Sequence, residues 1–170
     1  MDVFTAVKGR RSIRKFLKKD IPENILDRLV DALIWAPSAG NLQSRKFFFI
    51  RDENTRSRLA SAALNQGFIA EAPVVVVCCA DAGKISSYGQ RGVELYVLQD
   101  VAASVMAMML VAHEEGLGTC WVGAFKDEEV SKVLNIGNSL RPVAIVPVGY
   151  PAQISKPTSR VSRTEAVEFR

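Results

Sequence analysis

Apolar residues follow a helical period in an early part of the chain. Leucine, isoleucine and valine recur at helical spacing over Ile25–Ile34, which predicts an amphipathic helix that ends before Pro37. Upstream, Asp20 and Glu23 stand three residues apart with Pro22 between them, as in a capping box that opens a helix. One amphipathic helix is therefore expected between Asp20 and Pro37.

Three continuous apolar runs predict strands at Phe47–Ile50, Pro73–Ala80 and Arg141–Tyr150. The second run is apolar at every position, so both of its faces are expected to be covered and the strand to be central in its sheet. The third run contains Pro142 and Pro147, which lack a backbone N–H and therefore predict a bulge or an edge position.

The longest helical pattern runs over Glu94–Glu115, and Gly116 is expected to end it. This helix is apolar on nearly all sides, which is typical of a helix buried in the core or between subunits. Its continuous apolar run, Val101–Ala112, is too short to cross a bilayer. The polar stretch Ala82–Gly92 before it is expected to be a loop, and its composition suits a mobile lid.

Shorter helices are expected at Val3–Lys8, at Asp52–Leu64 and at Asp127–Leu134, where Asp127 would be the cap. Gly9 follows the first of these helices and suits the left-handed residue that ends many helices.

The length and composition describe one ordinary globular domain. The chain has 170 residues, of which 48% are hydrophobic and 24% charged, so it can bury a real core. Residues 1–150 are expected to form this domain. The tail, residues 151–170, has little apolar periodicity, so it is either disordered or laid across another surface. The net charge of +4 weakly favours anionic small molecules or nucleic acid as partners.

The sequence lacks the residues that several kinds of metal and catalytic site require. The three cysteines, Cys78, Cys79 and Cys120, form neither a disulfide framework nor a zinc spacing, and we expect them to be reduced and buried. The single histidine, His113, excludes a His-rich metal site, and no Gly-x-Ser-x-Gly motif accompanies it for a Ser-His-Asp triad. We expect no signal peptide, because Asp2 and the early arginines frame no apolar segment of the kind that a signal peptide has. We therefore expect a cytoplasmic protein without a metal site.

Residues 9–16, Gly-Arg-Arg-Ser-Ile-Arg-Lys-Phe, bring four cations and a hydroxyl together near the N-terminus. If residues 10–14 are extended, the side chains of Arg10, Ser12 and Arg14 share one side of the strand. Two guanidinium groups and a hydroxyl suit a phosphate or another small dianion. The alternative is a solvated basic turn that binds nothing.

Four stretches, in order, resemble the flavin-dependent nitroreductase family: Arg10–Phe16, Ala36–Gln43, Gly116–Gly123 and Pro147–Pro151. Each motif alone is weak, but the four share the order and spacing of that family, and the likeness covers about residues 2–167. The resemblance implies an α+β, nitroreductase-like three-layer sandwich with a mainly antiparallel central sheet flanked by helices. It also implies an obligate homodimer with two FMN sites at the interface and the tail packed on the partner subunit.

The resemblance assigns the cofactor contacts by matching position. The basic stretch would hold the FMN phosphate and polar ring atoms, and the loop in 36–43 would reach the flavin from the other subunit. The stretch 116–123 would lie along the ring, where a backbone N–H can bond N5. A late basic residue would contact the phosphate, but the tail departs from the family pattern and leaves two candidates. The implied cofactor-binding residues are Arg10, Arg11, Ser12, Arg14, Pro37, Ser38, Asn41, Gln43, Trp121, Val122, Gly123 and, for the late basic position, Arg160 or Arg163.

Simpler roles stay open for four residues of these motifs. Ser38 could be only a loop former and Asn41 only a turn residue. Trp121 could belong to the core, and Cys120 is expected to do so because a flavin needs no thiol partner for its redox work.

The activity implied by the resemblance is that of an FMN-dependent oxidoreductase. It would pass two electrons from NADH or NADPH through flavin N5 to a small electron-poor acceptor of nitroaromatic, quinone or flavin type, in a ping-pong cycle. Because the flavin carries the chemistry, no catalytic side chain is expected, although Arg14 would support the reduced ring electrostatically. No Gly-x-Gly-x-x-Gly motif predicts a Rossmann site for the nicotinamide.

The sequence does not select the native acceptor, nor NADH over NADPH. Two other functional classes stay open. One is a flavin-binding or flavin-delivery protein without turnover, and the other is a nucleic-acid binder that uses the basic residues at its two ends. The first would bind FMN without being reduced by a nicotinamide, and the second would bind no flavin.

Overall fold

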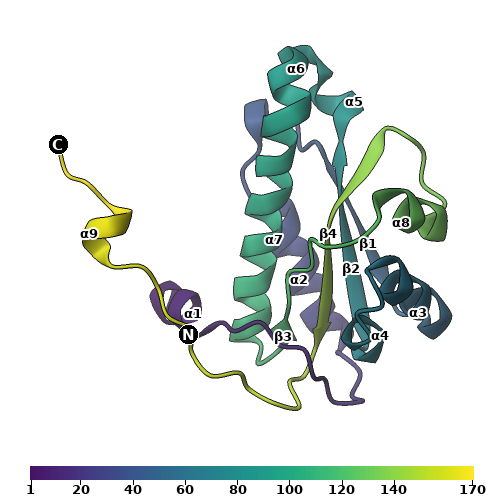
Figure 1. The fold of residues 1–170 in the computed structure, drawn as a ribbon, viewed down its shortest axis with the longest axis vertical. Helices are drawn as coiled ribbons and strands as arrows, with labels where there is room; N and C mark the ends of the chain where they lie inside the picture. Colours follow the sequence, from purple (N-terminus) through teal and green to yellow (C-terminus); the bar gives the residue numbers. More distant parts are fainter.

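A four-stranded antiparallel sheet forms the middle layer of the protein (Figure 1). The computed structural model describes residues 1–170. Each pair of neighbouring strands is antiparallel, which confirms the predicted kind of sheet. In spatial order, the strands are β1 (Arg45–Ile50), β2 (Val74–Asp81), β4 (Leu140–Gly149) and β3 (Gly118–Thr119).

Helices cover both faces of this sheet, so the predicted α+β three-layer sandwich is confirmed (Figure 1). Two long helices, α2 (Glu23–Trp35) and α7 (Val97–Glu114), lie on one face. Three shorter helices lie on the other: α3 (Glu53–Ala62), α4 (Phe68–Glu71) and α8 (Asp127–Leu134).

The apolar run in β2 explains why both faces are covered. Successive side chains of a strand point to opposite faces, so Val74, Val76 and Cys78 join the cluster under α2 and α7. Val75, Val77 and Cys79 join the cluster under α3 and α8. All six are buried, and β2 has a neighbour on each side, as expected for a central strand.

The two prolines of β4 accompany a bulge but not an edge. The register with β2 shifts between Cys78, which faces Ala144, and Cys79, which faces Pro142. Of the two predicted alternatives, the bulge is confirmed and the edge position is not found, because β4 lies between β2 and β3. On the β3 side, the paired residues of β4 are limited to Ile145, Val148 and Gly149, so neither proline has to donate an N–H there.

The start of α2 corrects the predicted capping box. The helix begins at Glu23, with Pro22 at the N-cap and no side-chain cap, and Asp20 lies outside it. Glu23 does not reach back to the cap because both of its carboxylate oxygens accept from Arg51, at 2.6 and 2.7 Å. At α8, likewise, Lys126 rather than Asp127 occupies the N-cap.

The stretch 82–92, predicted as a loop, is helical and continues into α7. Asp81 starts it by accepting from the N–H groups of Gly83 and Lys84, and Ile85 is buried, so only one face of the segment is polar. Its parts are α5 (Ala82–Ile85), η2 (Ser86–Tyr88), α6 (Gly89–Arg91) and the π-helical turn η3 (Gly92–Tyr96).

This continuation lengthens the apolar helix beyond the predicted run. By length and composition, Ala82–Glu114 would suffice to cross a membrane. In the fold, however, its α7 part packs against α2 and β2, which is the position of a core helix. Gly116 has a φ of +74° and ends the helix region, as predicted.

The two ends of the chain lie outside the sandwich. The first helix, α1 (Val3–Gly9), includes Gly9 as its last residue, so the predicted left-handed role of Gly9 is wrong. A glycine suits the position for another reason, since a Cβ there would lie 2.5 Å from Nε2 of His113. Residues 152–170 are exposed and add nothing to the core. They contain one short helix, α9 (Arg163–Ala166). A short 3-10 turn, η1 (Ala39–Asn41), follows α2.

Candidate functional site

The basic stretch after α1, called the basic strand below, is an extended segment that runs beside β3 and joins it by an isolated bridge. Ser12 forms an isolated bridge with Thr119, and the N–H of Ile13 donates to the Thr119 carbonyl at 2.9 Å. Further on, Phe16 bridges Pro151. Ile13 and Phe16 are buried, whereas Arg14 is exposed, so the apolar side chains of this segment anchor it while its polar ones face outward.

Gly118 lets this strand lie close to β3. A Cβ at Gly118 would lie 2.6–2.9 Å from three carbons of the Ile13 side chain, which real contacts do not allow. Gly118 therefore lets the backbone of β3 lie close to a bulky group, the β-branched side chain of Ile13.

We expect Gly118→Ala to destabilise the protein by about 1–3 kcal/mol, because the new methyl group overpacks the contact with Ile13. The matched control is Gly67→Ala, since nothing lies within 4 Å of a Cβ there and its φ of −55° suits alanine. Urea denaturation of both variants is the measurement. Equal stabilities would mean that strand 10–16 does not rest on β3 in this way.

A cavity of about 210 Å³ lies between the basic strand and the start of the tail. Guanidinium, ammonium and hydroxyl groups line it, without a carboxylate. Nε of Arg10 is buried and has no hydrogen-bond partner. An unpaired buried donor is costly unless a ligand accepts from it, so this cavity suits a phosphate or a similar anion. Its lining residues are Arg10, Arg11, Ser12, Arg14, Ser155, Lys156, Thr158 and Arg160.

The tail reaches the cavity through hydrogen bonds to the basic strand. The N–H of Ala152 donates to the Lys15 carbonyl at 2.9 Å, and the Ser155 hydroxyl donates to the Ser12 carbonyl at 3.2 Å. These bonds bring Arg160 to the cavity, whereas Arg163 does not line it. Sequence reasoning missed Ser155, Lys156 and Thr158, because their segment has no periodicity that shows which side chains share a side.

The cations of the basic strand differ in what they contact. Nη1 of Arg11 donates to the carbonyls of Lys8, Gly9 and Arg10 at 2.6–3.0 Å, so this guanidinium closes the end of α1. The guanidinium of Arg14 lies over the Phe68 ring, 5.8 Å from its centroid. Arg10 therefore has the buried donor that lacks a partner.

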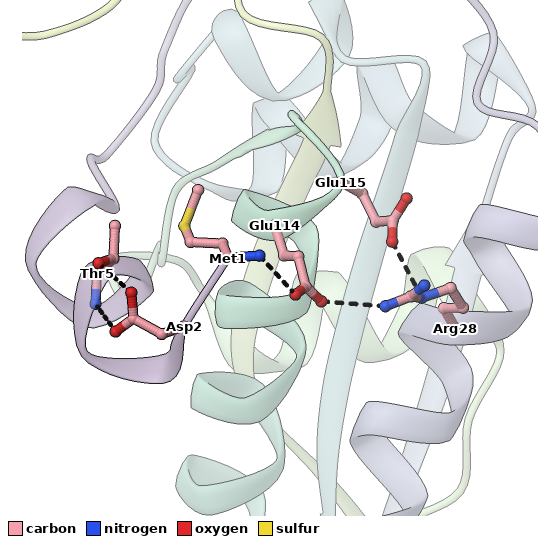
Figure 2. Close-up of polar contacts among 6 residues, drawn as sticks. All are labelled: Met1, Asp2, Thr5, Arg28, Glu114 and Glu115. Carbon is pink, nitrogen blue, oxygen red and sulfur yellow. Dashed lines mark hydrogen bonds and ion pairs between the residues drawn. The ribbon is translucent and has the colours of Figure 1, made fainter.

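Ion pairs at the opposite end of α1 connect this helix to α7 and α2 (Figure 2). The Met1 ammonium lies 3.4 Å from a Glu114 carboxylate oxygen, and Arg28 contacts Glu114 and Glu115 at 3.0 Å each. Asp2 caps α1 by accepting from the Thr5 N–H at 3.0 Å. Because these groups are partly exposed, the pairs locate α1 but add little stability.

Beyond β3, Cys120 is buried and its thiol is no thiolate. Burial raises its pKa, and the nearby Arg14 and Ser12 offset only part of this effect. All three cysteines are free and buried, as predicted. Trp121 and Gly123 are exposed, so either is open to a ligand. The N–H of Val122 donates to the Ile145 carbonyl at 2.9 Å and is not free for a flavin N5.

The predicted loop at Pro37–Gln43 lies far from the cavity of its own chain. It leads into β1, where Arg45 faces Ala80 at one end of β2. The basic strand borders β3, where Thr119 faces Val148, which in turn faces Val74 at the other end of β2. Because a strand rises about 3.3 Å per residue, the two groups lie roughly 20 Å apart along the sheet. One chain does not bring Pro37, Ser38, Asn41 and Gln43 to the basic strand.

The fold and this cavity define an α+β protein with a cationic site beside its sheet and a second set of polar residues at the opposite end. Comparison with known proteins identifies the family. Residues 7–67 and 60–150 match the Nitroreductase family, and the chain belongs to that family. The suspected family resemblance is thereby confirmed.

Individual relatives agree with this assignment. An NADH dehydrogenase from Thermus thermophilus is 29% identical, with the match covering 100% of this chain and 97% of the relative. FMN reductase [NAD(P)H] from Bacillus subtilis is 26% identical over 99% of this chain and 73% of its own. The solved structure of an FMN-dependent nitroreductase from Clostridium difficile has the same fold, with a TM-score of 0.84, 24% identity and 98% of each chain covered.

Proposed function

We propose that this protein is an FMN-dependent oxidoreductase that passes two electrons from NADH or NADPH to a small electron-poor acceptor. Two observations carry the proposal: the cavity is free of carboxylates, and Arg10, which lines it, has a buried Nε without a hydrogen-bond partner. The family membership and the FMN- and NAD(P)H-related names of relatives support the same cofactor and reductant. Nitroaromatics, quinones and free flavin are the proposed acceptor classes.

The residues present fit the phosphate end of FMN. Arg10 would donate from its unpaired nitrogen, and Ser12 and Arg160 would complete the set around the same anion. Arg14 is held over Phe68 and would place a positive charge beside the flavin, which favours electron uptake. When bound, FMN supplies the electron-transfer chemistry, so no side chain need act as acid, base or nucleophile.

The proposed active form is a homodimer. A second copy, related by a two-fold axis, would bring its Pro37–Gln43 loop to the basic strand that the first copy's own loop does not reach. Exposed apolar side chains on α1 and in the tail, among them Phe4 at 63% and Phe169 at 95% exposure, support a partner surface. We propose that the tail at 151–170 packs on that partner and that the protein is cytoplasmic.

The ring end of the proposed site draws on both copies. Trp121 and Gly123 of one copy and Ser38, Asn41 and Gln43 of the other would border the flavin, where their polar groups can bond its edge. Arg11 would contribute charge to the cavity through its fixed position at the end of α1. Arg163 is left out of the phosphate set because it does not line the cavity.

Extraction of the bound chromophore tests the cofactor. We expect the purified protein to be yellow, and chromatography of the chromophore released on denaturation to identify FMN. FAD in the extract, or no flavin retained after reconstitution, would contradict the proposal.

Cys120→Ser is expected to keep most of the rate at which NADH or NADPH reduces the protein-bound flavin. The thiol is buried and its pKa is raised, so it packs rather than reacts. Rapid-mixing reduction of the FMN-loaded variant is the measurement. A near-complete loss of reduction would mean that this thiol takes part in the chemistry.

A further inference from the structure

The loop at Pro37–Gln43 is held from one side by a buried arginine. Arg45, at the start of β1, is only 6% exposed. Its guanidinium donates to the carbonyls of Ile34, Ala36 and Pro37 at 3.0, 2.6 and 2.8 Å. These carbonyls lie at the end of α2, where the backbone leaves the helix, so a single side chain fixes the direction in which the loop begins.

A buried carboxylate holds the same loop from the other side. Asp100 of α7 is 4% exposed and lies between the buried Val97 and Val101 of that helix. Its Oδ1 accepts from the Ala39 N–H at 2.8 Å, and its Oδ2 accepts from the Ser44 hydroxyl at 2.6 Å. Ser44 itself has no exposed surface. The carboxylate thus ties the middle and the end of the loop to α7.

The loop has a backbone conformation that needs such support. Gly40, Asn41 and Gln43 have φ values of +54°, +54° and +51°, in the left-handed region that non-glycine residues rarely adopt. Within the loop, the side-chain bond to the backbone runs from the Gln43 N–H to the Ser38 hydroxyl, at 3.0 Å. A loop with two non-glycine residues at positive φ holds its shape only where surrounding contacts determine it.

We propose that Ser44, Arg45 and Asp100 are positioning residues that preset this loop for the flavin site of the second copy. The inference rests on the proposed dimeric FMN site. Each chain would then set the FMN affinity of the site whose basic strand belongs to its partner, through three side chains that are themselves buried. If the loop has its binding-competent shape in only a fraction of the molecules, the apparent affinity for FMN falls in proportion to that fraction.

Two buried serines provide a matched pair of variants. Ser44 and Ser104 have no exposed surface and each donates one hydrogen bond, Ser44 to Asp100 and Ser104 to the Leu33 carbonyl at 2.9 Å. Both serine-to-alanine changes remove a buried hydroxyl on the same side of the sheet, but only Ser44→Ala releases a bond that holds the loop. If Ser44 had only a structural role, the two variants would bind FMN with equal affinity.

The measurement is titration of the full-length apoprotein with FMN, followed by its fluorescence. We expect Ser44→Ala to raise the dissociation constant on the order of tenfold through lost pre-organisation, and Ser104→Ala to leave it within about twofold. In hydrogen exchange, the Ala39 amide should lose protection in Ser44→Ala alone. If Ser44→Ala does not fold, Asp100→Asn, which keeps the size of the side chain, takes its place in the same comparison.

Mixed dimers with an Arg10→Ala chain locate the effect. If Ser44 acts on the partner's site, a dimer of one Ser44→Ala chain and one Arg10→Ala chain has one site of wild-type affinity and one doubly damaged site. If it acts within its own chain, neither site has wild-type affinity, and the proposal is overturned. If the wild type binds FMN and the two variants Ser44→Ala and Ser104→Ala change its dissociation constant equally, the positioning role is also overturned. Failure of the wild type to bind FMN would instead reject the proposed function, and this inference with it.

Discussion

Arg10→Ala is expected to weaken FMN binding by about 10- to 150-fold. Hydrogen bonds of a charged group contribute roughly 1.5–3 kcal/mol, and each 1.4 kcal/mol corresponds to about tenfold in affinity. Among the cations that line the cavity, Arg10 should cause a loss of affinity in the upper part of this range when it is replaced by alanine. Its Nε is buried and unpartnered, whereas Arg11 and Arg160 already donate to nearby backbone carbonyls. The measurement is titration of the apoprotein with FMN.

Lys18→Ala is the control for this comparison. It removes the same charge two residues beyond the basic stretch, and Lys18 is exposed and does not line the cavity. A solvated lysine contributes little, so the variant should bind FMN with nearly wild-type affinity. Equal losses in the two variants would show that the segment acts only through its overall charge, as a solvated basic turn would.

Mixing two inactive variants is expected to restore about a quarter of the flavin sites. One variant is damaged at Arg14, in the basic strand, and the other carries substitutions at Ser38 and Gln43, in the loop. Each homodimer then has two damaged sites. In a heterodimer, one site collects both defects and the other collects none. Random reassortment of equal amounts gives about half heterodimers, so roughly one site in four is intact in a closed two-fold dimer.

The measurement is FMN binding and NAD(P)H-dependent reduction after co-refolding or co-expression of the two variants. The reason to expect recovery is the separation of the loop from the basic strand along the sheet of one chain. If heterodimers form and nothing is recovered, each site lies within a single chain. The loop residues would then have no part in binding the cofactor.

Much of the fold could be predicted because local patterns and tertiary structure agree. The continuous apolar run of β2 is buried on both faces, and the helical spacing over Ile25–Ile34 matches α2. Gly116 ends the long helix through its positive φ. In these segments the burial that stabilises the fold also determines the residue pattern, so the pattern is informative.

The errors arose where polar residues have partners that the residue pattern does not reveal. Glu23 resembles the last residue of a capping box, but it pairs with Arg51. The polar residues of 82–92 suggest a loop, yet they form the exposed side of a helical segment that Asp81 caps and Ile85 anchors. A local pattern does not contain these contacts.

In the candidate site, too, local patterns predict some residues and tertiary contacts determine the others. Arg10, Ser12 and Arg14 could be grouped because alternation along a strand is a local property. The tail residues Ser155 and Lys156, which share their cavity, could not, because only tertiary hydrogen bonds place them there. The buried positioning set of Ser44, Arg45 and Asp100 was likewise hidden, since charged residues at the ends of apolar runs usually lie in solvent.

The measurement that tests the central claim most directly is anaerobic mixing of the FMN-loaded protein with NADH or NADPH in a rapid-mixing spectrophotometer, followed by addition of a quinone or nitroaromatic. We predict that the nicotinamide bleaches the visible flavin absorbance and that the acceptor restores it, through repeated cycles. Tightly bound FMN that neither nicotinamide reduces would contradict the account and would indicate a protein that binds or delivers flavin without turnover.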